Sequence, residues 1–138
     1  MHRLLLLTLA LALPAQAADP RMAIKLSADE VGTVNGQMRA MLNGVGQIVA
    51  GVAANDMKVV AAAARGLGMS GNTHVPMSLR VKLPAEFKSM GHPMHVAFDD
   101  MARDAESLGD GNHALKQLGD IMVTCNTCHE TFRLVAKR

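Results

Sequence analysis

The chain has 138 residues, a length that suits a single domain. Its 14 basic and 12 acidic side chains give a formal net charge of +2, and so small a balance argues against nucleic acid or a charged membrane surface as the partner. Aromatic residues make up only 2% of the chain, with no Trp, no Tyr and three Phe. Since aromatic side chains normally supply much of the buried area of a core, another large apolar group is needed here.

The N-terminal segment has the pattern of a secretory signal peptide. A short basic start at residues 1–3 precedes an apolar run over residues 4–13, and Ala-Gln-Ala at 15–17 is a small-x-small cleavage site. The run is too short to span a bilayer as a permanent anchor. We therefore expect a signal peptide at 1–17, a mature domain at 18–138 and a periplasmic location, with an uncleaved N-terminal anchor as the alternative.

The first half of the mature chain predicts two helices. Apolar positions at steps of three and four predict an amphipathic helix over residues 28–53, and Ser27 followed by Glu30 is a capping-box pattern at its start. Its glycines each weaken it by about 1 kcal/mol relative to Ala, so tertiary packing must hold it. Asn55-Asp56 then caps a second, alanine-rich helix over residues 57–67.

The second half predicts a loop and two more long helices. Residues 69–82 are rich in Gly, Ser, Asn and Pro, which predict a loop. Pro84 begins a short helical turn that Gly91 stops, Pro93 begins the third long helix, and Asn112 caps the fourth, which continues toward the C-terminus. No segment alternates with a period of two. The sequence predicts an all-α fold, an antiparallel four-helix bundle.

The most specific motif is Cys125-Asn126-Thr127-Cys128-His129 on the last predicted helix. C-x-x-C-H is the attachment signature of c-type haem. The two thiols add to the haem vinyl groups as thioethers, and the imidazole becomes an axial iron ligand. Haem attachment takes place outside the cytoplasm, in agreement with the signal peptide. We expect one covalent haem near the C-terminal helix, where it would also supply the large planar apolar surface that the chain lacks.

Three other interpretations of the two cysteines stay open at this point. A redox-active C-x-x-C pair usually opens a helix next to a βαβ pattern, whereas this pair follows a long helical stretch. A structural zinc site needs four ligands; His113 lies twelve residues upstream, and no other pair has finger spacing. A structural disulfide between Cys125 and Cys128 is the third.

With these motifs the chain resembles the class II c-type cytochromes, the cytochrome c′ family. The resemblance rests on C-x-x-C-H on the last of four helices, on Phe132-Arg133 just after it, and on the corner between the first two helices at residues 48–51 and 55–56. It implies an exported four-helix bundle with one haem, His129 as the proximal iron ligand, and Arg133 near the haem edge. For Arg133, a solvated cation at the helix end is the alternative.

The resemblance also places the second axial position of the iron on the first helix. In the family, a bulky apolar residue there leaves the iron five-coordinate and open to small gases such as NO, whereas a Met gives six-coordinate iron suited to electron transfer. The family spacing counted back from Gly51 reaches Asn35, which is neither of these. A shift of one turn brings Met38 into place, with Met41 one turn beyond, and packing in the core is the alternative role for both. We expect Met38 to be the ligand, and the chain to carry single electrons between redox partner proteins.

The segment Met90 to His95 offers a second set of ligands. Its thioethers and imidazoles could hold Cu(I), so a copper-binding or purely structural helical bundle is the alternative outside the cytochromes. His95 is also a candidate for the haem pocket or the distal ligand, and a polar helix start with Met94 in the core is the remaining interpretation. We expect His74 and His113 at the surface.

No motif in the chain predicts catalysis. There is no Gly-rich phosphate loop and no nucleophile elbow. We therefore expect no enzymatic activity, no nucleic-acid partner and no stable membrane span. The glycines and alanines of the first two helices would permit close contact with a second copy in a homodimer.

Overall fold

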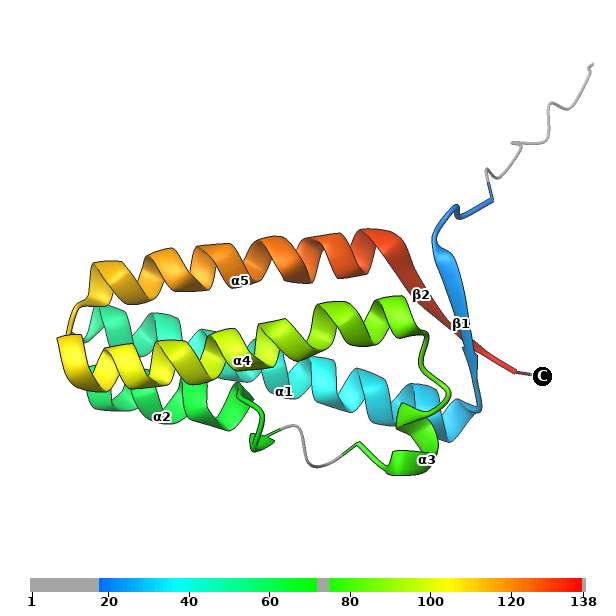
Figure 1. Ribbon diagram of the computed structural model, residues 1–138, viewed down its shortest axis with the longest axis horizontal. Helices are drawn as coiled ribbons and strands as arrows, with labels where there is room; N and C mark the ends of the chain where they lie inside the picture. The colour runs from blue at the N-terminus through cyan, green and yellow to red at the C-terminus, as the bar shows by residue number, and fades with distance from the viewer. Residues whose placement is uncertain (1–17, 72–74, 138) are drawn as a thin grey trace, which may run out of the picture.

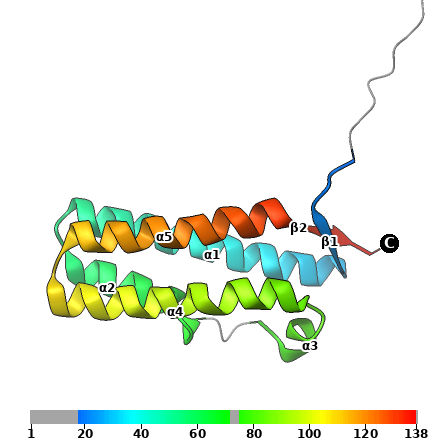
Figure 2. The same cartoon turned by 45° about the horizontal axis from the view of Figure 1, so that its top comes forward.

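The computed structural model describes residues 18–71 and 75–137, so the predicted signal peptide at 1–17 and His74 lie outside the described residues. The described elements follow in the order β1 (Met22–Leu26), α1 (Ala28–Ala53), α2 (Met57–Leu67), α3 (Met77–Arg80), α4 (Ala85–Leu108), α5 (Gly111–Thr131) and β2 (Phe132–Ala136). The four long helices lie side by side (Figures 1 and 2), an arrangement compatible with a helical bundle. None of the helices in this described part is long and apolar enough to cross a membrane.

The predictions for the first two helices are confirmed, including their caps. The Ser27 side chain accepts from the Glu30 backbone N–H, and the Glu30 carboxylate accepts from the Ser27 N–H, which completes the capping box. The Asp56 carboxylate caps α2 by accepting hydrogen bonds from the backbone N–H groups of Lys58 and Val59 in its first turn. Local sequence signals alone were sufficient for these two helices.

The prediction that Gly91 stops a short helix is wrong. Helix α4 runs without interruption from Ala85 to Leu108, with Gly91 and Pro93 inside it. A proline in a helix interior removes one hydrogen bond and costs about 3 kcal/mol. Packing along both halves of α4 offsets this cost, since Phe87 and Met90 before the proline and Phe98 after it all contact buried clusters.

Three further details differ from the prediction. Asp110, and not Asn112, is the N-cap of α5, because its carboxylate accepts from the backbone N–H groups of Asn112 and His113. Within the predicted loop 69–82, Pro76 precedes the short helix α3. Helix α5 is the fourth predicted helix, and it ends at Thr131 instead of continuing toward the C-terminus.

The prediction of an all-α fold misses a two-stranded parallel sheet. Strand β1 pairs with β2 in the register Met22↔Phe132 to Leu26↔Ala136. The apolar side chains of Ile24 and Leu26 are buried on either side of an exposed Lys25, a period-two pattern only three residues long. The sheet and α3 lie at the same end of the molecule as the C-terminal end of α5 (Figures 1 and 2).

Candidate functional site

The buried core is divided into two clusters. The first is built from α1, α2, α4 and α5 and includes Ile48, Val60, Phe98 and Met101. The second lies at the sheet end and consists of Ile24, Leu26, Val34, Leu79, Leu83 and Phe132. Cys125 packs against the first cluster and Cys128 against the second. The C-x-x-C-H motif therefore lies at the boundary between them.

A cavity of about 460 Å³ lies at this boundary. Helix α5 contributes Cys125, Cys128 and His129 to its wall, and α1 contributes Met38 and Met41. The wall is mainly apolar and includes six methionines and two of the three phenylalanines of the chain: Met38, Met41, Met69, Met90, Met94, Met122, Phe87 and Phe98. Its size falls within the range of about 300–1,000 Å³ typical of small-molecule and cofactor sites.

The structure places the first-helix candidates relative to the cavity. Met38 and Met41, one helical turn apart, both line the cavity and are partly buried. Asn35 is exposed and is not among the lining residues. The count from Gly51 therefore ends on a residue outside the cavity, whereas the one-turn shift ends on a residue inside it.

The two cysteines are free, half-buried thiols. Burial raises the pKa of Cys125 above its usual value of 9.0, and burial together with the neighbouring Cys125 raises the pKa of Cys128. Redox-active C-x-x-C pairs depend on a lowered thiol pKa, so the environment here opposes that chemistry. The Cys125 thiol donates a weak bond to the Met94 thioether sulfur, 3.9 Å away.

His129 lies in the last turn of α5, where the sheet fixes the backbone. Its side chain is exposed and borders the cavity, and its carbonyl accepts from the Arg21 guanidinium at 3.3 Å. Arg133 lies on β2, where its Nε donates to the Arg21 carbonyl at 3.3 Å and lies 3.8 Å from the Asp19 carboxylate. Arg133 does not line the cavity, so its role at a haem edge stays a prediction.

Helix α4 fixes the turn that follows α2. His95 Nδ1 donates to the Leu67 carbonyl at 2.6 Å, which satisfies one of the open carbonyls at the end of α2. One turn later, the Asp99 carboxylate accepts from the Met69 N–H at 3.0 Å. Because a bond to a carbonyl requires the proton on Nδ1, the tautomer of the neutral His95 ring is set, with an unprotonated Nε2. His95 and Met69 both line the cavity.

Of the remaining predicted ligands, some line the cavity and one lies away from it. In the segment Met90 to His95, every residue except Pro93 lines the cavity. His113 instead pairs with the Asp104 carboxylate at 2.9 Å, and this hydrogen bond lowers the pKa of Asp104. Across residues 18–71 and 75–137, no three His, Cys, Asp or Glu side chains lie close enough to hold a metal ion together. A zinc site built on the two cysteines therefore lacks its further ligands within this part of the chain.

The structure adds wall residues that the sequence did not single out. Met69 follows α2, Arg80 ends α3, Leu83 lies between α3 and α4, and Lys88 lies in the first turns of α4. The segment from 69 to 82 predicted only a loop, and no local pattern tells which of its side chains meet a helix distant in sequence. The methionine excess was the one available signal, and it pointed to Met69 among others without distinguishing them.

An empty cavity of this size would be costly. At about 24 cal/mol per Å³, a void of 460 Å³ corresponds to about 11 kcal/mol. That is comparable with the whole stability of a domain, about 5–15 kcal/mol. The cavity is open on one side, as the exposed wall residues Leu42 and His129 indicate, so water relieves part of this cost. A bound apolar group would relieve more of it, and the donor set fits a haem: two thiols and an imidazole on one wall, with thioethers on another.

Comparison of the chain with protein-family models, with curated proteins and with solved structures gives no match.

Proposed function

We propose that the chain is an exported monohaem c-type cytochrome that carries single electrons between redox partner proteins in the periplasm. One observation carries the proposal: Cys125, Cys128 and His129 line the same largely apolar cavity as Met38 and Met41. The four long helices, side by side, support an antiparallel four-helix bundle of the class II type around it. A haem held there supplies reversible one-electron chemistry, which the protein tunes through its ligands and surroundings.

Each wall has a defined role in this proposal. Cys125 and Cys128 form the two thioether links, and His129 supplies the proximal imidazole. Met38 supplies the second axial ligand, and a His/Met pair favours a comparatively high reduction potential. The apolar wall limits the access of water, which restricts reorganisation around a charge change. No side chain is assigned to substrate chemistry, so the protein acts as a carrier and not as an enzyme.

The test is an optical spectrum of the full chain produced together with a haem-attachment apparatus. We expect haem that stays bound on a denaturing gel, and a ferric spectrum with the weak red charge-transfer band of a methionine–iron bond. A Cys125→Ser/Cys128→Ser variant should lose the covalent haem. A high-spin spectrum that shifts with NO would support a gas-binding cytochrome c′ instead, and the absence of bound haem would overturn the proposal.

A copper-binding bundle is the second candidate, because Met90, His92, Met94 and His95 all border the cavity. Thioether and imidazole ligands suit Cu(I). Metal analysis of the same preparation separates the two functions. Copper in stoichiometric amount without iron would favour this candidate, whereas iron in a one-to-one ratio with the chain supports the cytochrome.

A further inference from the structure

Apart from the two thiols, the ionisable side chains among the described residues of the cavity wall are all basic. Arg80 and Lys88 line the cavity together with His92, His95 and His129, and no Asp or Glu is among the described residues that line it. The chain as a whole holds 14 Lys and Arg and 6 His against 12 Asp and Glu, so a wall with five basic side chains and no carboxylate is more basic than the chain. A cationic wall on an otherwise apolar cavity suits a ligand that is apolar over most of its surface and anionic at one edge.

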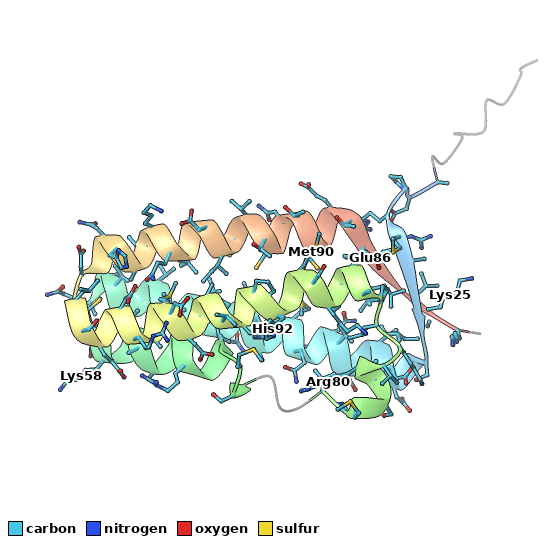
Figure 3. All side chains as sticks on the ribbon, viewed as in Figure 1. Lys25, Lys58, Arg80, Glu86, Met90 and His92 are labelled. Carbon is cyan, nitrogen blue, oxygen red and sulfur yellow. The ribbon has the colours of Figure 1, made fainter. Side chains whose placement is uncertain are left out.

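The cationic side chains come from a different wall than the cysteines. Arg80 is the last residue of α3, Lys88 lies in the first turns of α4, and His92 follows Lys88 by one turn. In Figure 3, Arg80 and His92 lie on the side of α4 that faces away from α5. The thiols and His129 belong to α5. The cavity therefore has an attachment wall on α5 and a cationic wall on α3 and α4.

The fold holds Arg80 in place at this wall. Leu79 and Leu83 on either side of it are buried in the sheet-end cluster, which anchors the segment. The half-buried Arg80 side chain donates through Nε to the Val75 carbonyl at 3.0 Å. Lys82, in the same segment, is instead drawn into an ion pair with Glu30. Arg80 lines the cavity, whereas Lys82 does not.

The shape of a haem matches these two walls. Its two vinyl groups lie on one half of the porphyrin and its two carboxylates on the other half. If the vinyl edge is attached to α5, the carboxylate edge points toward the opposite wall. A carboxylate inside a largely apolar cavity is costly unless it is paired, and a guanidinium binds it through two parallel hydrogen bonds.

We propose that Arg80, assisted by Lys88, binds the carboxylates of a porphyrin whose opposite edge is attached to Cys125 and Cys128. This inference rests on the proposed function and extends it by assigning the orientation of the cofactor. Arg80 acts as a binding residue. Lys88 is exposed and contributes less, since exposed ion pairs are worth little.

The test titrates the haem-free full chain with two porphyrins and follows the Soret absorbance. Haemin carries both carboxylates, and haemin dimethyl ester carries neither. We expect the wild-type chain to prefer haemin. Arg80→Gln should weaken haemin binding by about 10- to 160-fold while leaving ester binding unchanged, because that range corresponds to about 1.5–3 kcal/mol for a charge-assisted bond. Lys88→Gln should weaken haemin binding about two- to fivefold.

Arg39→Gln is the matched control, since Arg39 is an exposed α1 arginine next to Met38 that does not line the cavity. It should change neither affinity. Equal wild-type affinity for the two porphyrins, or an equal loss for both in Arg80→Gln, would overturn this inference while leaving the cytochrome proposal intact. No binding of haemin would overturn this inference, whereas the cytochrome proposal is decided by the covalent haem of the chain produced with the attachment apparatus. If Arg80→Gln loses its helical circular dichroism, the wild-type preference and Lys88→Gln decide the result.

Discussion

If the proposed haem is bound, removing it should destabilise the fold by several kcal/mol. The cavity of about 460 Å³ lies between the two core clusters and is bordered by residues of each. At about 24 cal/mol per Å³ the void would cost about 11 kcal/mol if it stayed empty and rigid. Water entry on the open side and inward movement of the methionines reduce this figure. We therefore expect the haem-loaded chain to be more stable by several kcal/mol, below this upper figure.

The assay is urea unfolding of the haem-loaded and haem-free full chains, followed by far-ultraviolet circular dichroism and linear extrapolation. The Cys125→Ser/Cys128→Ser variant, produced under the loading conditions, is the matched control and should unfold like the haem-free wild type. Equal midpoints for the loaded and haem-free chains would refute the reasoning, because an occupied cavity and an empty one would then have the same free energy.

Three further predictions concern single positions. Met38→Ala should lose the methionine–iron band and have a lower reduction potential, whereas Met41→Ala keeps the band. Gly51→Ala should be less stable than Gly46→Ala by about 1–3 kcal/mol in urea unfolding. A Cβ at Gly51 would lie 3.1 Å from the backbone nitrogen of Val60 in α2, whereas a Cβ at Gly46 would meet nothing within 4 Å. For Asp19, whose pKa the Arg21 guanidinium lowers to about 2, the stability difference between wild type and Asp19→Asn should be full above pH 4 and vanish as the pH falls to 2.

Each of these predictions has a contrary result. If Met41→Ala, and not Met38→Ala, abolishes the band, the ligand lies one turn further along α1. If Gly51→Ala gains as much stability as Gly46→Ala, the close approach of α1 and α2 relaxes without cost. For Asp19 the sign is fixed by linkage: a carboxyl with a lowered pKa stabilises above its unfolded value and loses this contribution on acidification. A difference that grows on acidification would contradict the ion pair.

The sequence was sufficient for elements whose limits are set by local chemistry. The capping box at Ser27 and the carboxylate of Asp56 both act on the backbone within three residues, so the starts of α1 and α2 follow from the sequence alone. The same rule selected Asn112 for α5, where Asp110 caps the helix through an identical mechanism two residues earlier. Such errors concern the position of a boundary and not the existence of the helix.

Helix α4 and the sheet depend on contacts between distant residues. Gly91 and Pro93 are local signals for a break, but α4 packs on the core on both sides of them, and tertiary packing outweighs the local cost. Strand β2 was predicted as helix because its residues continue an apolar pattern from α5. Its parallel partner β1 is more than a hundred positions earlier, and no local pattern records that pairing.

The residues of the candidate site likewise include some that the sequence could predict and some that depend on tertiary packing. Cys125, Cys128 and His129 form a contiguous motif, and the resemblance to class II cytochromes led to Met38 after a shift of one turn, so these residues could be proposed from the sequence. Arg80 could not, since its place in the wall depends on how α3 packs against the start of α4. The composition did indicate that a large apolar group was missing, and the cavity is where the described residues leave room for one.

The spacing of the two cysteines has a consequence for the cooperativity of the fold. Cys125 packs against the cluster of the long helices, and Cys128 packs against the cluster that includes β1, α3 and β2. One rigid group attached to both thiols would therefore connect the two clusters across the cavity that separates them. In the haem-free chain, the sheet end lacks this connection and has fewer buried side chains than the helical cluster. The sheet end should then open first, because local opening begins where buried contacts are fewest. Attachment of the cofactor would thus convert two weakly coupled parts into one cooperative unit, in a chain whose three phenylalanines are too few to fill the boundary themselves.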